Sequence, residues 1–231
     1  MKKINSSINE LMIVYEDESL IVINKPKNML THHTKYDNSN TVIDALIHKI
    51  NVDEFEDKSR PGVVQRLDRN TTGLMVIAKT KLSYDSLLKQ IVDKSLVKKY
   101  LAIVHGTFKH DSLVIKCPII RSKKNTTKMV VSDDPKAKEA TTLVSVLKQK
   151  NDLSLIECTL VTGRTHQIRV HMNYLHHYVY NDPLYGHDDG IKNYDQFLHS
   201  YFLSFNHPLT NELLEFKSSP DEIFNSVIKY E

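Results

Sequence analysis

Two charged residues that could form a reactive pair, Arg66 and Asp68, stand close together in the segment QRLDRNTTG. We predict a strand over 63–68 that enters the polar turn DRNTTG, with Arg66 and Asp68 on one face and Leu67 on the other. A carboxylate at a strand end can act as a nucleophile or a base, and a nearby arginine keeps it ionised against burial. An isolated pair of this type is more often a salt bridge supporting a loop, so other motifs must decide.

The second cluster of candidate residues is TGRTHQIRVH, at 162–171. Gly163 and Thr165 predict a turn from a strand into a helix, with Arg164 at its apex and Arg169 further along the helix. Such a helix start suits a phosphate or an acidic side chain. Four histidines follow in 166–177, but their spacing does not match that of zinc-binding motifs, so we expect no metal.

The segments around these clusters predict the elements that must position them. LMIVYEDESLIVINKP indicates a hairpin, TVIDALIHKI a helix behind the N-cap candidate Thr41, and SYDSLLKQIVDKSL a second helix. A third helix is expected over THQIRVHMNYL. Strands are expected over 74–78 and over YLAIV, SLVIKC, TKMVVS, ATTLVSVL and LSLIECTLV. The pattern predicts an α+β fold with a mixed, largely antiparallel sheet and flanking helices.

We expect a short polar leader over 1–14 and a single catalytic domain over 15–231, since no internal repeat or Gly/Ser/Pro-rich linker interrupts the chain. The basic stretch RSKKNTTK at 121–128 predicts an exposed hairpin or loop. The two cysteines, Cys117 and Cys158, have no metal-binding spacing. No uncharged apolar run approaches the roughly 20 residues of a membrane helix, so we expect a cytoplasmic protein.

Both clusters belong to a series of four motifs, which follow one another along the chain in the order RLDRNTTG, KKYLAIVHG, TGRTHQIRVHM and NDPLYG. Together they resemble the signatures of the RluA-type pseudouridine synthases. The resemblance runs from YEDESLIVINKP to QFLHSYFLSFNHPLTNELLEF and so covers nearly the whole chain. It implies the catalytic domain of that family and an isomerase that converts uridine in structured RNA to pseudouridine. The RNA would be large-subunit ribosomal RNA or transfer RNA.

The resemblance also implies a role for individual residues. Asp68 matches the essential aspartate, Tyr100 the tyrosine that stacks on the base, and Arg164 the arginine that pairs with the aspartate. The residues implied to bind the substrate are Arg66, which is linked to flipping of the nucleotide, Leu198, which would lie against the uracil, and Gln167 and Arg169. Because the isomerisation is redox-neutral, we expect neither a cofactor nor a metal.

Three departures from the family pattern stand out. Gln65 replaces the usual histidine and Thr72 the usual serine, which changes hydrogen bonding beside Asp68. Many relatives also carry a small S4-like RNA-binding domain, whereas only fourteen residues precede Tyr15. We therefore expect the catalytic domain, as a monomer, to recruit RNA itself.

The net charge of +3 permits an RNA partner without demanding one. Candidate phosphate contacts are Lys79, Lys81, Lys98, Lys99, Arg121, Lys123, Lys124 and Arg169. Two alternatives stay open. One is a catalytically silent relative that only holds RNA. The other is a hydrolase with Asp68 as nucleophile and His105 or His166 as base, although no nucleophile elbow is present.

Overall fold

The computed structural model describes residues 11–34, 37 and 39–229. The chain divides into two compact units. The first unit contains the described residues up to Leu96 together with Ser204–Ser218, and the second contains Val97–Leu203 together with the described residues from Ser219 onward. The prediction of one catalytic domain over 15–231 stays a prediction. The first ten residues of the expected leader lie outside the described residues.

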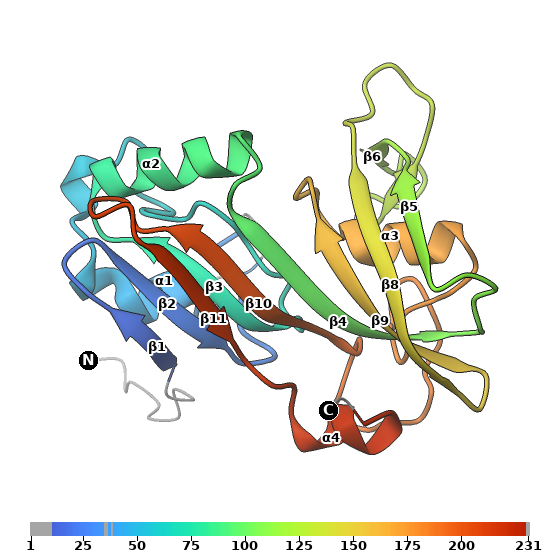
Figure 1. Cartoon of the computed structure of the whole chain (residues 1–231). Coiled ribbons are helices and arrows are strands. Elements are labelled where there is room, and N and C mark those ends of the chain that lie inside the picture. Colours follow the sequence, from blue (N-terminus) through green and yellow to red (C-terminus); the bar gives the residue numbers. More distant parts are fainter. Residues whose placement is uncertain (1–10, 35–36, 38, 230–231) are drawn as a thin grey trace, which may run out of the picture. The chain divides into compact units, whose positions relative to one another are not determined.

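The first unit is built on an antiparallel sheet that begins with the predicted hairpin. β1 (Met12–Glu16) pairs with β2 (Leu20–Lys25), and β2 pairs with β3 (Thr72–Ala78). The apolar side chains of β2 are fully buried, which explains the continuous β-branched run in the sequence. β11 (Leu213–Lys217) pairs with β10 (Leu198–Asn206), whose last residues belong to this unit (Figure 1).

Threonine caps start both α-helices among the described residues of the first unit. At the start of α1 (Val42–Leu46), the Thr41 side chain accepts a hydrogen bond from the Asp44 backbone amide. The Asp44 side chain accepts one from the Thr41 backbone amide, which completes a capping box. The predicted helix over 41–50 is shorter than expected, because a 3₁₀ turn (Ile47–Lys49) replaces its end, and a second follows at Val52–Glu54. α2 (Lys81–Val92) is capped by Thr80 and buries Leu87.

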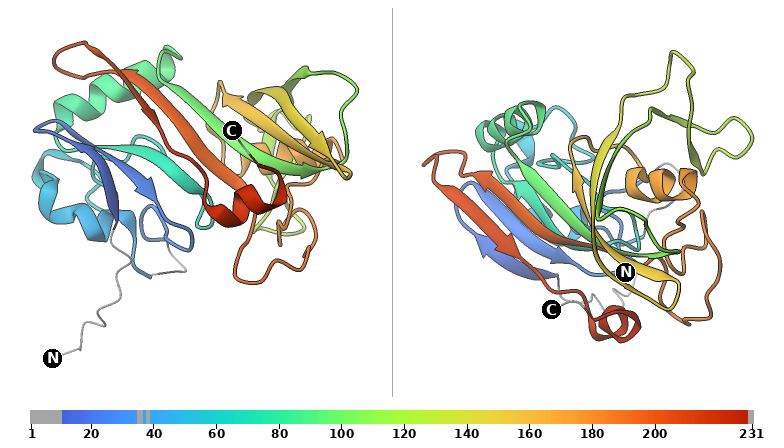
Figure 2. Two further views of the ribbon diagram at one scale, coloured as in Figure 1. Left: turned by 60° about the horizontal axis from the view of Figure 1, so that its bottom comes forward. Right: turned by 45° about the vertical axis from the view of Figure 1, so that its right-hand side comes forward.

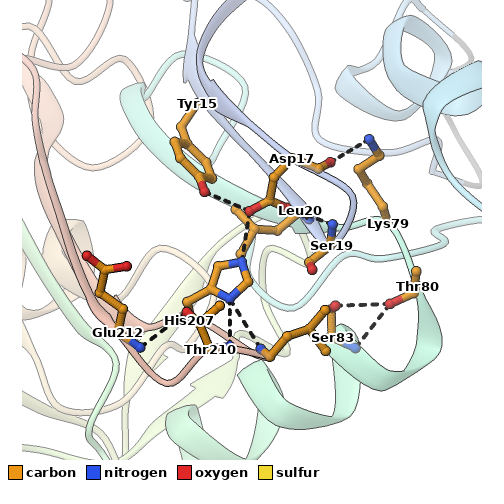
Figure 3. A network of polar contacts seen from close by, with 11 residues as sticks. Tyr15, Asp17, Ser19, Leu20, Lys79, Thr80, Ser83, His207, Thr210 and Glu212 are labelled. Atoms are coloured by element: carbon orange, nitrogen blue, oxygen red, sulfur yellow. Dashed lines mark hydrogen bonds and ion pairs between the residues drawn. The ribbon is translucent and has the colours of Figure 1, made fainter.

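A polar network closes the β1–β2 turn of the first unit (Figure 3). The Asp17 carboxylate accepts hydrogen bonds from the Tyr15 hydroxyl and the Ser19 backbone, both at 2.7 Å, and lies 2.8 Å from Nε2 of His207. The other ring nitrogen of His207 accepts from the backbone of Thr210 at 3.1 Å. Burial raises the pKa of Asp17, but these hydrogen bonds outweigh burial and leave the pKa lowered.

The second unit contains a four-stranded antiparallel stretch in the order β4-β9-β8-β5 (Figure 1). Its strands confirm four of the predicted segments and are β4 (Val97–His105), β5 (Ser112–Lys116), β8 (Thr141–Lys150) and β9 (Leu153–Leu160). A separate hairpin pairs β6 (Ile119–Arg121) with β7 (Met129–Val131), so the basic stretch at 121–128 is its turn, as predicted.

The described residues of the second unit also include the helices α3 and α4. α3 (Gln167–Tyr174) lies beside β8 (Figure 2), where its residue His171 is hydrogen-bonded to Thr142 at 2.9 Å. The short α4 (Glu222–Val227) buries Phe224 among the aromatic side chains of the unit and has no counterpart among the predicted elements. In both units, no helix of the described residues is long and apolar enough to cross a membrane. The elements confirm the α+β class with a largely antiparallel sheet.

One predicted strand is wrong. Residues 64–68 form no strand, and Val63 makes only an isolated bridge with Ile77. Strand alternation therefore does not determine the directions in which the side chains of Arg66 and Asp68 point. The segment is irregular because side chains from elsewhere in the first unit hold its backbone groups.

Candidate active site

The predicted site residues divide between the two units. Arg66 and Asp68 lie in the first unit, and the other five lie in the second. Within the first unit, Arg66 is exposed, Leu67 is buried and Asp68 is half-buried. A half-buried carboxylate is accessible to a substrate, which the predicted chemistry requires.

Hydrogen bonds hold the backbone on both sides of Asp68. The buried hydroxyl of Thr31 donates to the Leu67 carbonyl at 3.2 Å and accepts from the Leu67 amide at 3.3 Å. The carbonyl of Asp68 itself accepts from the Thr71 amide at 3.1 Å, which closes the DRNTTG turn. These hydrogen bonds fix the backbone position of Asp68, although Asp68 is not part of a β-strand.

The third support is a fully buried lysine, Lys25, at the end of β2. Its ammonium donates to the carbonyls of Pro26 at 2.9 Å, Met29 at 2.8 Å and Arg69 at 2.8 Å. Burial lowers the pKa of Lys25 to about 7, and the negative charge of Asp68 opposes that shift. Lys25 therefore anchors the residue after Asp68 and brings a positive charge near its carboxylate.

Sequence reasoning missed Lys25 and Thr31. A usable signal for the lysine was its place in VINKP, directly after an apolar run that had to be buried. A lysine there must find partners inside the protein.

Two further features shape this segment. At Gly62 (φ +71°), a Cβ atom would lie 2.0 Å from the Ala78 carbonyl oxygen, so only glycine fits this approach to β3. Gln65, which replaces the histidine expected from the family pattern, has a buried Nε2 without a hydrogen-bond partner among the described residues. The consequence of this replacement for substrate choice stays a prediction.

In the second unit, the side chain of Gln167 organises the turn between β9 and α3. Its amide oxygen accepts from the Thr162 hydroxyl at 2.8 Å and from the Arg164 amide at 2.9 Å. Its amide nitrogen donates to Thr141 and Thr142, both at 3.0 Å. Gln167 is buried, and its hydrogen bonds hold this turn in place. Its predicted contact with substrate stays a prediction.

The two arginines of this motif have different surroundings. Arg164 is exposed at the turn, and its Nε donates to the Glu139 carbonyl at 2.9 Å. Arg169 is buried and forms a two-point ion pair with Asp182, at 2.6 and 2.7 Å, beneath the ring of Tyr185. The geometry gives Arg169 a structural role, while its predicted role in substrate binding stays untested.

Tyr100 and Leu198 are both buried residues of strands. Tyr100 lies in β4 opposite Cys158 of β9, and Leu198 begins β10. Burial raises the pKa of the Cys158 thiol far above its ordinary value, so this cysteine stays protonated at neutral pH.

The two histidines of the hydrolase alternative are engaged within the second unit. Nε2 of His105 lies 3.1 Å from Asp189, and Nδ1 of His166 lies 2.9 Å from the Tyr185 hydroxyl. Both rings thus have structural partners.

Comparisons with known proteins agree with the motif order. The model of the RNA pseudouridylate synthase family matches residues 19–174. The RNA pseudouridine synthase YlyB of Bacillus subtilis is 39% identical over 95% of this chain and 72% of its own length. The ribosomal large subunit pseudouridine synthase D of Zymomonas mobilis is 37% identical over 89% of this chain and 68% of its own length.

Among solved structures, human RNA pseudouridylate synthase domain containing 1 has the same fold. Its TM-score is 0.74 at 24% sequence identity, over 98% of this chain and 89% of that protein. With the family model and the two relatives, these findings establish that the chain belongs to the RNA pseudouridylate synthase family, the isomerases that convert uridine in RNA to pseudouridine.

Proposed function

We propose that this chain modifies a uridine of large-subunit ribosomal RNA and that the Asp68 carboxylate carries the chemistry. The observation that supports the assignment most directly is the scaffold around Asp68. Thr31 and Lys25 hold the residues on either side of it, while its own side chain stays half-exposed. The choice of RNA rests on relatives such as the Zymomonas mobilis protein, which is named for the large ribosomal subunit.

The reaction breaks the bond from ribose C1′ to uracil N1 and joins C1′ to C5. Asp68 either attacks C1′ or removes a sugar proton, and both routes need an ionised carboxylate. Lys25 lies close enough to Asp68 for the two charges to interact.

The target nucleotide must leave its stack, at a cost of a few kcal/mol. Stacking on the ring of Tyr100 would return roughly 1–3 kcal/mol, which is comparable to the extrusion cost. Arg66, exposed beside Asp68, is long enough to occupy the space that the base leaves. We also propose that the protein acts as a monomer in the cytoplasm.

The test maps pseudouridine in total RNA from cells that carry the wild-type chain, lack it, or carry Asp68→Ala. Asp85→Ala is the matched control, because Asp85 is an exposed aspartate whose partner is Lys81 on the same helix. We expect one ribosomal site to be lost in the deletion and in Asp68→Ala, and kept in Asp85→Ala.

Each other outcome removes a different part of the proposal. A site that persists in Asp68→Ala but not in the deletion would show that another residue carries the chemistry. Loss of a transfer-RNA site would replace the substrate. If no site changed in the deletion, the alternative of a catalytically silent RNA-binding protein would take precedence.

A further inference from the structure

The second unit buries a lysine that the reaction described above does not use. Lys98 lies in β4 with 7% of its surface exposed. Within the described part of the chain, no group forms a hydrogen bond or an ion pair with its ammonium, and burial alone lowers its pKa, to about 8. A buried cation without a partner is costly and seldom retained without a use.

The next residue provides an internal contrast. Lys99 points to the opposite face of β4, is partly exposed, and forms an ion pair with Glu157 at 3.2 Å. Adjacent lysines on one strand therefore have different environments. Lys99 has the surroundings of an ordinary surface cation, and Lys98 does not.

Lys98 lies beside the turn that carries Arg164. A Cβ atom added to Gly163 would lie 3.6 Å from the Lys98 Nζ atom, so the ammonium approaches the backbone of this turn. Gly163 is exposed although Lys98 is buried. The ammonium is thus close to the protein surface at a turn that Gln167 holds in place.

Strand alternation puts Lys98 on the same face of β4 as Tyr100, about 7 Å apart along the strand. Tyr100 is the residue proposed to stack on the target uracil. An ammonium one pleat away from that ring is within reach of the carbonyl oxygens of a stacked base. An RNA phosphate, in contrast, stays on the outside of the nucleic acid and is met by exposed cations.

We propose that the ammonium of Lys98 donates a hydrogen bond to a carbonyl oxygen of the target uracil and stabilises the negative charge that forms on the base. The proposal rests on the proposed function, in particular on Tyr100 as the stacking residue. It assigns Lys98 as a catalytic residue, whereas sequence reasoning had it only among the phosphate contacts.

The charge arises in both routes open to Asp68. When the C1′–N1 bond breaks, its electron pair stays on the uracil, where N1 and the two carbonyl oxygens share it. An electron pair of the uracil then forms the C1′–C5 bond. In the first route the bond between C1′ and the Asp68 carboxylate breaks at this step, and in the second route the sugar recovers the proton that Asp68 had removed. C5 loses its proton and N1 gains one, so atoms and electrons balance. Lys98 keeps its own proton throughout and acts by electrostatics, as a donor does in an oxyanion hole.

The test compares Lys98→Met with Lys116→Met, a change at an exposed lysine of β5 in the same unit, on an RNA that the wild-type protein modifies. Methionine fills the buried volume without charge, so Lys98→Met should fold. We expect the single-turnover rate at saturating protein to fall about 100-fold or more in Lys98→Met, the usual cost of one such donor. The Kd of Lys98→Met for the RNA should change less than threefold, and Lys116→Met should keep a rate within threefold of wild type.

Two outcomes would overturn the inference while leaving the proposed function intact. A rate in Lys98→Met within threefold of wild type would make Lys98 a residue of the core. Weaker RNA binding with an unchanged rate at saturation would make it a phosphate contact. Absence of product with the wild-type protein on every ribosomal and transfer RNA would instead overturn the proposed function, and this inference with it.

Discussion

Each unit buries a lysine beside a predicted reactive segment, but the two ammonium groups have opposite surroundings. Lys25 donates to three backbone carbonyls within 2.9 Å, one of them that of Arg69. Lys98 has no such acceptor among the described residues. Burial lowers the pKa of both, to about 7 for Lys25 and about 8 for Lys98.

The difference distinguishes Lys25, a cation with a structural role, from Lys98, a cation that is available to bind a ligand. A buried charge whose hydrogen bonds are complete stabilises the geometry around it, and its removal leaves acceptors without a donor. A buried charge without acceptors weakens the free protein, and its removal relieves that cost. Replacement of Lys25 should therefore lower the stability of the protein, whereas replacement of Lys98 should not.

The largest effect is expected at Asp68, the charge that Lys25 faces. Asp68→Ala should lower the rate of pseudouridine formation by about 10⁴-fold or more, because it removes the reacting group itself. The loss in free energy of unfolding should be smaller than that of Lys25→Met, because hydrogen bonds from Thr31 and Lys25 hold the backbone on both sides of Asp68. Single-turnover assays and urea denaturation measure the two quantities, and a large loss of stability would contradict this separation.

The next effect tests the comparison directly. Lys25→Met should lower the free energy of unfolding by roughly 3–5 kcal/mol, because three buried carbonyls lose their donor. Lys98→Met should leave it unchanged or raise it. The midpoints of urea unfolding measure both changes in stability. An equal loss of stability in the two variants would contradict the distinction between the two lysines.

The pH dependence of stability should also reveal the buried ammonium of Lys98. The unfolded lysine keeps its proton up to about pH 10.5, while folded Lys98 loses it near pH 8, so the unfolded chain binds more protons between these values. The contribution of Lys98 to stability therefore rises with pH in this window, by roughly 2 kcal/mol.

The difference in unfolding free energy between wild type and Lys98→Met at pH 8 and pH 10 isolates this effect. Lys25 contributes with the same sign and buried Cys158 with the opposite sign above pH 9, but both are common to the two proteins. A difference that does not change with pH would contradict the prediction.

The smallest effect serves as a control for Lys25. Asp17→Asn weakens the network with Tyr15 and His207 in the same unit and should cost about 1–2 kcal/mol of stability. The rate of pseudouridine formation should stay within about twofold of wild type, because this network holds the β1–β2 turn. A matching loss of activity would mean that any loss of stability in the first unit lowers the rate.

Local signals in the sequence predicted much of the fold. Thr41, the predicted N-cap, caps its helix through short-range hydrogen bonds, and alternating apolar runs predicted β4, β8 and β9. The motif order predicted the family. The strand at 63–68 was wrong, because the bonds that hold that segment come from Thr31 and Lys25, more than 30 positions away.

The sequence by itself determined the class of fold, the family and the reaction, because these depend on local periodicity and on motifs read in order. Only the tertiary structure decided which cations have internal partners. Adjacent Lys98 and Lys99 are the same residue type, and Arg169 is identical in type to exposed Arg164. Burial and the positions of distant carbonyls and carboxylates distinguish them, because a charge is worth most where water is excluded.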